Sequence, residues 1–211
     1  MKKVIILLAV CAFGSANAQV SFKPGVKAGY SASTITGFGA DYRNNFYLGA
    51  YGNLALGKVY NMQFELMYLR QGAENISIIN YDFNHSKETV RTGGLYLEYV
   101  SLNLINKFNF DKFSLHIGPG LDILVADNES SNYPGGLNGG SYVGDAAYSI
   151  ENEVDLTFNI GLGYNITDKL GVEARMRQGI IEPIYARSND YSYSLSNLNR
   201  SFMVGLTYTF K

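Results

Sequence analysis

The chain has 211 residues, with 17 basic and 18 acidic side chains and a formal net charge of −1. It contains no basic patch or run, so its charge pattern gives no argument for nucleic acid as a partner. Charged residues make up only 17% and aromatic residues 14%, and glycine is frequent. Beyond the N-terminus, no segment offers the roughly 18 consecutive apolar residues that a transmembrane helix needs.

The N-terminal residues have the pattern of a secretory signal peptide. Two lysines precede an apolar run over residues 4–13, and the small-residue triplet Ala16-Asn17-Ala18 follows, as at a signal cleavage site. We expect cleavage after Ala18, so that residues 1–18 are the signal and residues 19–211 are the exported protein. Cys11 lies inside this signal, and Val10 before it does not fit a lipoprotein site, so the exported protein is expected to lack cysteine and disulfides.

Residues 25–68 contain three segments of alternating character. Apolar residues alternate with lysine, glycine and serine over residues 25–35; similar patterns cover residues 46–56 and begin again at residue 62. A period of two in hydrophobicity indicates a β-strand whose faces meet different environments. We therefore expect three strands, separated by a polar loop at 36–45 and a short turn at 57–61.

The fourth expected strand, over residues 92–108, changes its parity half-way. Its apolar residues are Leu95, Leu97 and Tyr99, followed by Val100, Leu102 and Leu104. If the apolar side chains all stay on one face, an extra residue must lie between the two sets. The sequence therefore predicts a β-bulge near Val100 and Ser101.

Residues 113–125 show the longest alternation in the chain. Bulky apolar residues take the odd positions from Phe113 to Val125, and small or polar residues take most even positions. Three more alternating segments follow, at residues 154–165, 170–177 and 201–210. Long loops are expected at 74–91, 127–153 and 179–199, and short turns at 109–112 and 166–169.

These eight expected strands are joined by connections that are alternately long and short. That order is typical of an up-and-down barrel with loops at one rim and tight turns at the other. An even number of strands places both chain ends on the tight-turn side, which in an outer membrane faces the periplasm. We predict an all-β fold: one domain forming an eight-stranded antiparallel up-and-down transmembrane β-barrel.

Alternation alone leaves open which face points inward, because a soluble lipocalin-like barrel would bury the apolar face. The polar face repeats glycine, for example Gly29, Gly118 and Gly161. Glycine inside a strand needs a reason such as close approach, and small residues suit the narrow interior of an eight-stranded barrel. Aromatic residues also gather near strand ends, where membrane barrels carry interfacial girdles. The apolar face is therefore expected to contact lipid.

Charged and polar residues on the inward face are expected to form a cluster in the lumen. They are Glu65, Glu98, His116, Asp122, Glu173, Arg175 and Arg177. One interpretation is a path for protons or ions; the favoured one is a paired polar plug, because buried charges need partners. Glu98 and Arg175 lie on strands that are not adjacent, so we expect them to meet across the barrel.

The long loops mix tyrosine with serine, asparagine and glycine. The tyrosines are Tyr133, Tyr142, Tyr148, Tyr185, Tyr191 and Tyr193. Rigid amphipathic rings among small polar residues are typical of binding loops. Exposed loops are polar in any case and tyrosine also decorates barrel rims, so a binding surface and a merely solvated loop remain alternatives.

No arrangement of residues predicts catalysis, a metal or a cofactor. The two histidines are His85, in a loop, and His116, on the lumen face, and neither suits a Ser–His–Asp site. His116 has no second His or Cys at ligand spacing. The triplet Gly161-Leu162-Gly163 lies inside a strand and so does not predict a dinucleotide loop.

The expected strands contain a series of short motifs, each at its own position. They are Gly25-Val26-Lys27-Ala28-Gly29, Glu65-Leu66-Met67-Tyr68 with Gly72, Tyr96-Leu97-Glu98, Gly118-Pro119-Gly120, Gly161-Leu162-Gly163-Tyr164, Val172-Glu173-Ala174-Arg175 and Val204-Gly205-Leu206-Thr207-Tyr208-Thr209-Phe210. In this order the chain resembles, over residues 22–210, the porin-family outer-membrane barrels of the Bacteroidetes type, related to the PorT-like group. It departs from them at Ser101, where a proline is expected, and at Lys211, which follows the terminal aromatic residue. The resemblance implies a fold rather than a task.

We expect a protein of the bacterial outer membrane, surrounded by lipid and lipopolysaccharide and inserted by the barrel assembly machinery. Its expected function is non-enzymatic: a structural or surface-binding protein whose lumen is filled by side chains. Binding would use its long extracellular loops, and we expect an unidentified protein partner, either extracellular or periplasmic. The alternatives are a narrow porin for small solutes and, from the PorT-like resemblance, an accessory barrel of a protein secretion machine.

Overall fold

The computed structural model describes residues 21–37, 40–75, 77–81, 87–91, 94–127, 147–150, 152–187 and 197–210. Eight strands close into an antiparallel barrel in the ring order β1-β12-β10-β9-β7-β6-β3-β2. They are β1 (Ser21–Ile35), β2 (Asp41–Ala55), β3 (Tyr60–Glu74), β6 (Leu95–Phe110), β7 (Phe113–Asp127), β9 (Val154–Asn165), β10 (Leu170–Gly179) and β12 (Asn199–Thr209). The predicted fold class is confirmed.

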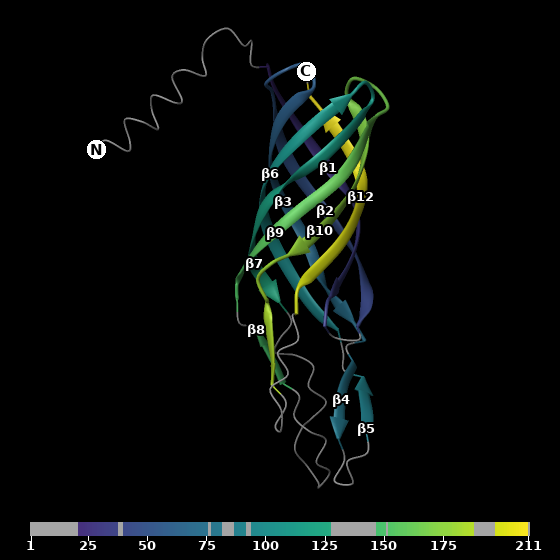
Figure 1. Cartoon of the computed structure of the whole chain (residues 1–211), viewed down its shortest axis with the longest axis vertical. Helices are drawn as coiled ribbons and strands as arrows, with labels where there is room; N and C mark the ends of the chain where they lie inside the picture. The colour runs from purple at the N-terminus through teal and green to yellow at the C-terminus, as the bar shows by residue number, and fades with distance from the viewer. Residues whose placement is uncertain are drawn as a thin grey trace, which may run out of the picture.

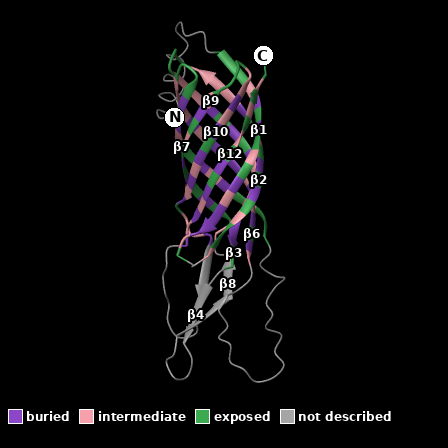
Figure 2. Ribbon diagram, turned by 90° about the vertical axis from the view of Figure 1, so that its right-hand side faces the viewer, coloured by how far each residue is buried: buried purple, intermediate pink, exposed green. Residues whose placement is uncertain are grey.

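Burial alternates along most of the length of the barrel strands (Figure 2), and β1 and β3 depart from the alternation near their C-terminal ends. On β9, Leu156 and Ile160 are exposed, whereas Asp155, Thr157 and Asn159 are buried. Polar groups therefore face inward and large apolar side chains face outward, the reverse of a soluble protein. A wall of this kind is stable when lipid rather than water surrounds it.

The two rims of the barrel differ. Tight turns join β2 to β3, β6 to β7 and β9 to β10, and the C-terminus lies at the same rim (Figure 1). In the turn after β6, Asp111 has a positive φ of 56°, a left-handed conformation that aspartate tolerates better than most residues. Since short turns face the periplasm in such barrels, the opposite rim is extracellular.

The long connections contain short strands that the alternation did not predict. β4 (Ser77–Tyr81) pairs with β5 (Lys87–Arg91), and β8 (Ala147–Ile150) pairs with β11 (Ile184–Arg187). Figure 1 shows these pairs beyond the barrel, at the end opposite to the C-terminus. Because β8 and β11 belong to different connections, their pairing joins two extracellular loops to each other.

β6 keeps one parity along its whole length, so the predicted bulge at Val100 and Ser101 is wrong. Its inward-facing residues include Leu95, Leu97, Tyr99, Ser101, Asn103 and Ile105, all buried. The prediction assumed that bulky apolar side chains stay on the lipid side. At this end of the barrel they fill the lumen instead.

The register shift lies in the same part of the sheet but on the neighbouring strand. Glu98 of β6 pairs with Ala126 of β7, whereas the next residue, Tyr99, pairs with Leu124. The extra residue is therefore Val125, in β7. Leu124, just before the bulge, has the inward parity of Asp122 and packs against the buried apolar cluster.

Residues 1–20 and Lys211 lie outside the described residues. Cleavage after Ala18 therefore stays a prediction. In the described part of the chain, no helix is long and apolar enough to cross a membrane.

Candidate functional site

An ionic cluster crosses the middle of the lumen. Glu65 of β3 and Arg175 of β10 come from opposite sides of the ring. They form a bidentate pair, with 2.6 Å between Arg175 Nη1 and Glu65 Oε2 and 2.9 Å between Nη2 and Oε1. Parallel Arg–carboxylate bonds of this kind are strong and directional. The pair therefore connects opposite walls of the barrel.

Lys27 of β1 completes this cluster. Its Nζ lies 2.7 Å from Glu65 Oε1 and 2.7 Å from Glu173 Oε1. Together with Arg175, two cations face two carboxylates, and all four side chains are almost fully buried. Such a neutral, mutually bonded set compensates for the loss of water around each charge.

His116 borders the cluster on β7. Its Nε2 lies 2.8 Å from Ser114 Oγ, and its Nδ1 lies 3.9 Å from Glu173 Oε2. Gly163 on β9 leaves room for the ring, because a Cβ there would come within 2.9 Å of His116 Nε2. Among the described residues, no group of His, Cys, Asp and Glu side chains could hold a metal ion.

A second polar cluster lies on the extracellular side of the first. Arg177 Nη2 is 2.6 Å from Asp122 Oδ1, and it also donates to Ser101 Oγ at 3.0 Å. Gln71 Nε2 donates to the other carboxylate oxygen of Asp122 at 3.1 Å. This cluster links β3, β6, β7 and β10. It therefore connects β3 and β10 a second time, closer to the extracellular rim.

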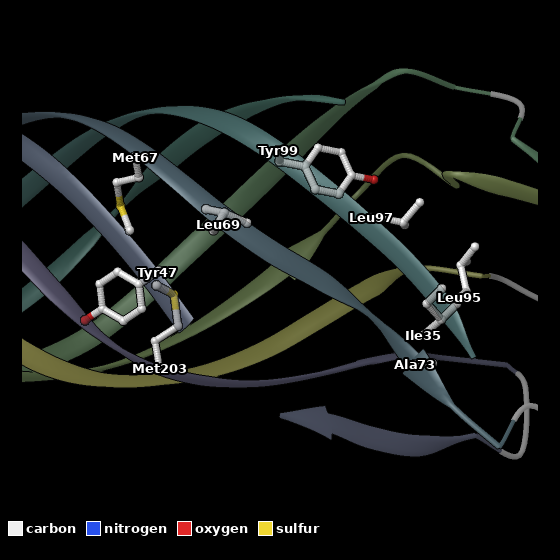
Figure 3. Packing of buried hydrophobic residues seen from close by; sticks show 9 residues of the cluster. All are labelled: Ile35, Tyr47, Met67, Leu69, Ala73, Leu95, Leu97, Tyr99 and Met203. Carbon is white, nitrogen blue, oxygen red and sulfur yellow. The ribbon is translucent and has the colours of Figure 1, made fainter. Parts of the chain in front are cut away.

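Apolar side chains fill the lumen around and beyond these clusters (Figure 3). Ile35, Ala73, Leu95 and Leu97 gather near the extracellular end, and each is at most 1% exposed. Further along lie Tyr47, Met67, Leu69, Tyr99 and Met203. Polar and apolar layers together leave the interior occupied by side chains.

Asp155 ties the chain that follows β10 to the extracellular mouth of the barrel. Its Oδ1 accepts backbone N–H groups from Ile180 at 3.2 Å and Ile181 at 3.0 Å. Asn199 Nδ2 lies 3.4 Å from its other oxygen and 3.3 Å from Tyr99 Oη. The first residues of this loop are therefore held against the rim.

The structure places most of the predicted cluster inside the barrel, but in a different arrangement. Glu65, His116, Asp122, Glu173, Arg175 and Arg177 are all buried in the lumen. Glu98 is not there: its flanking residues on β6 face inward, so it lies on the outer wall. The expected pair of Glu98 and Arg175 is wrong, because Arg175 meets Glu65 and Glu173, while Glu98 lies 2.9 Å from Arg70.

Sequence reasoning missed Lys27, which joins the two carboxylates, and the amides Gln63 and Gln71. Lys27 had the right parity, since it stands between Gly25 and Gly29 on the inward face of β1. Gln63 Nε2 donates to Glu65 Oε1 at 2.7 Å. The alternation indicates that these side chains point into the lumen, but the neighbouring sequence does not indicate which residues they contact.

Of the predicted loop tyrosines, two lie on described strands. Tyr148 belongs to β8, where it pairs with Ala186, and Tyr185 belongs to β11, where it pairs with Ser149. The others lie outside the described residues, and they are Tyr133, Tyr142, Tyr191 and Tyr193. The loop surface therefore stays a prediction.

A family model described as "Outer membrane protein beta-barrel domain" matches residues 4–210. The chain belongs to this family. The protein is thus an outer-membrane β-barrel, and the lumen described above is the interior of a membrane-spanning wall. The finer relation to PorT-like proteins is not part of this match. No curated protein matches the sequence.

Several solved structures are similar to this chain at low identity. Ail, the attachment invasion locus protein of Yersinia pestis, is 13% identical with a TM-score of 0.47, covering 89% of this chain and 98% of that one. Neisserial surface protein A is 12% identical with a TM-score of 0.47, covering 92% and 100%. OprG from Pseudomonas aeruginosa is 9% identical with a TM-score of 0.49, covering 92% and 98%.

Proposed function

We propose that this protein is a non-enzymatic outer-membrane barrel with a closed lumen, acting as a structural or surface-binding protein through its extracellular loops. The bidentate bridge from Glu65 to Arg175 carries the proposal, because it crosses the lumen between opposite strands. An eight-stranded barrel is only wide enough for side chains to fill. The apolar layer toward the mouth adds a second obstacle to ions.

The extracellular side supports a binding role. The pairing of β8 with β11 builds one small sheet from two loops, and β4 pairs with β5 in a hairpin within a third connection. A rigid barrel that presents loops is a common arrangement for recognition, because loops vary while the scaffold holds their ends. A partner of these loops would be an extracellular protein, a periplasmic partner would have to bind the short turns instead, and nucleic acid is not expected.

Conductance in planar bilayers tests the closed lumen. The wild type should give no large, steady single-channel currents. A variant with Glu65→Ala and Arg175→Ala, which removes the bridge, serves as the positive comparison if it still folds. Steady currents from the wild type would overturn the closed lumen.

Loop deletion tests the binding role. Residues 128–146 would be replaced by a short glycine-serine linker, and the protein on intact cells would be cross-linked and its partners identified. The matched control shortens the connection at residues 82–86. Identical partner profiles for the wild type and both variants would contradict recognition through the loops.

A narrow porin is the second candidate. Several buried polar atoms of the lumen have no hydrogen-bond partner among the described residues, including Arg177 Nη1 and Glu173 Oε2. Such atoms favour internal water, which a narrow pore would require. A third candidate, an accessory barrel of a secretion machine, rests only on the PorT-like motifs and predicts co-purification with secretion components.

The proposal includes export and insertion. The signal over residues 1–18 would be removed before the barrel assembly machinery inserts residues 19–211 among lipid and lipopolysaccharide. The mass of the protein purified from outer membranes tests the cleavage, since it should correspond to a chain beginning at Gln19. A mass that includes Met1 would contradict it.

A further inference from the structure

Two charged side chains of the outer wall, Arg70 and Glu98, lie opposite each other on β3 and β6. At the described outward-facing positions, the wall carries large apolar residues such as Phe64, Leu66, Leu102 and Leu162. Both charged residues lie near the loops, where β3 and β6 approach their extracellular ends. Charges on a lipid-facing wall are tolerated near an interface and disfavoured at the midplane.

Two arginines meet at this place. Arg70 is about a third exposed, with its side chain at 37%, and its Cζ lies 5.0 Å from the centroid of the Phe46 ring. Arg43 Cζ lies 3.9 Å from the centroid of the Tyr96 ring, and its Nη1 donates to the Gln71 carbonyl oxygen at 3.0 Å. Tyr96 and Glu98 are two residues apart on β6, so the ring that holds Arg43 and the carboxylate that holds Arg70 are neighbours on the same face of one strand.

The backbone is shaped to bring Arg43 here. Arg43 belongs to β2 and Tyr96 to β6, so its side chain must cross the intervening strand β3. It does so near Gly72, whose φ of 124° is in a region that favours glycine. A Cβ at Gly72 would collide with the Leu95 carbonyl oxygen. The register of β2 against β3 also shifts between Tyr42 and Tyr47.

The carboxylates do not neutralise both arginines. Glu98 pairs with Arg70 at 2.9 Å and also accepts a hydrogen bond from Tyr68 Oη at 2.5 Å. Glu74, at the extracellular end of β3, is exposed. Within the described ranges, no salt bridge joins Arg43 to any carboxylate. Arg43 stacks on the exposed Tyr96 ring and could therefore pair with an anion supplied by a ligand.

We propose that Arg43 and Arg70 bind a phosphate group of lipid A in the outer leaflet. Planar guanidinium groups bind phosphate through paired hydrogen bonds. The rings of Phe46, Tyr68 and Tyr96 lie beside them, as aromatic side chains do at the level of lipid head groups. The apolar wall toward the membrane centre would contact the acyl chains, so the source of the phosphate is a lipid rather than the free ion.

The experiment uses the full-length exported protein, purified and folded in detergent. Retention of three probes is compared by native mass spectrometry: phosphorylated lipid A, dephosphorylated lipid A with the same acyl chains, and inorganic phosphate. The wild type should prefer phosphorylated over dephosphorylated lipid A by roughly tenfold, since a hydrogen bond to a charged group contributes that much. Equal retention of the two lipids would overturn the proposal, and binding of inorganic phosphate alone would overturn its lipid source.

Three variants sharpen the test. Arg43→Gln with Arg70→Gln should abolish the preference, whereas Glu98→Gln should strengthen it, because it removes the carboxylate that competes for Arg70. Lys112→Gln removes a cation at the periplasmic rim and should leave the preference unchanged. If Lys112→Gln lowers the preference as much as the arginine changes do, the attraction is non-specific and the proposal fails.

Folding of each variant is checked by its heat-dependent mobility in electrophoresis. If the double arginine variant does not fold, Glu98→Gln still decides, because its predicted effect is a gain. An unchanged or weaker preference in folded Glu98→Gln would count against the site. These outcomes are independent of whether the lumen is closed or the loops bind a protein.

Discussion

Glu65 and Glu98 lie on neighbouring strands, and each is paired with an arginine, but they occupy opposite sides of the barrel wall. Glu65 is fully buried, and it bridges the lumen to Arg175 at 2.6 Å. Glu98 is 29% exposed in its side chain and meets Arg70, its cross-strand neighbour, at 2.9 Å. The two ion pairs have similar distances, but breaking them should cost different amounts of stability, because a buried charge that loses its partner cannot be rehydrated.

Removing Glu65 should give the largest loss. Glu65→Ala leaves Lys27 and Arg175 with an excess of positive charge in the lumen, and we expect a loss of ~3–5 kcal/mol in the free energy of unfolding. Urea titration of the barrel refolded in lipid vesicles measures it. Glu98→Ala is the matched control, and losses of equal size at the two positions would contradict the distinction.

Placing a charge on the lipid-facing outer wall should give the next largest loss in the free energy of unfolding. Ile160 is exposed on β9, and Ile160→Arg places a charge on the lipid face, for an expected loss of ~2–4 kcal/mol near the midplane. Asn159→Ser changes the adjacent lumen position, and it should be much milder. The same urea titration compares them, and equal tolerance would mean that the two faces have been assigned the wrong way round.

A double-mutant cycle should show which arginine each glutamate uses. For Glu65→Ala with Arg175→Ala, we expect a coupling of ~0.5–3 kcal/mol, with the double variant less affected than the sum of the single ones. For Glu98→Ala with Arg175→Ala, the losses should add to within ~0.5 kcal/mol, because these side chains are not in contact. The reverse result would restore the pair that the sequence suggested.

The smallest effect is expected at the exposed pair. Glu98→Ala should change the free energy of unfolding by only ~0–1 kcal/mol. Raising the salt concentration should reduce that difference, because exposed charges are screened, but it should leave the loss in Glu65→Ala nearly unchanged. A salt-independent effect at Glu98 would show that this pair is more buried than its exposure suggests.

The alternation of the sequence was sufficient for the fold class and for most strand positions. The strand expected at residues 154–165 is β9, Val154–Asn165, and the inward face of β10 carries Glu173, Arg175 and Arg177 as its parity requires. The reason is local: in a strand, successive side chains point to opposite faces. The face of a residue is thus set within its own strand, once the phase of the strand is known.

The local pattern failed where the environment changed along one strand. On β6, Leu95, Leu97 and Tyr99 are as apolar as any lipid-facing residue, yet they fill the lumen. If these three residues faced lipid, Glu98 would face the lumen, whereas it lies on the outer wall. No neighbouring residue reveals that the lumen becomes apolar near its mouth, because the side chains that pack there come from several other strands.

The sequence by itself therefore determined a membrane barrel with a small and polar inner face, since period and composition are properties of each strand. Only the closed barrel decided the partners: Glu65 with Arg175, Lys27 between two carboxylates, and Arg43 across β3 onto Tyr96. These contacts join residues far apart in the chain. Their existence depends on strand register and ring order, which are set when all eight strands close.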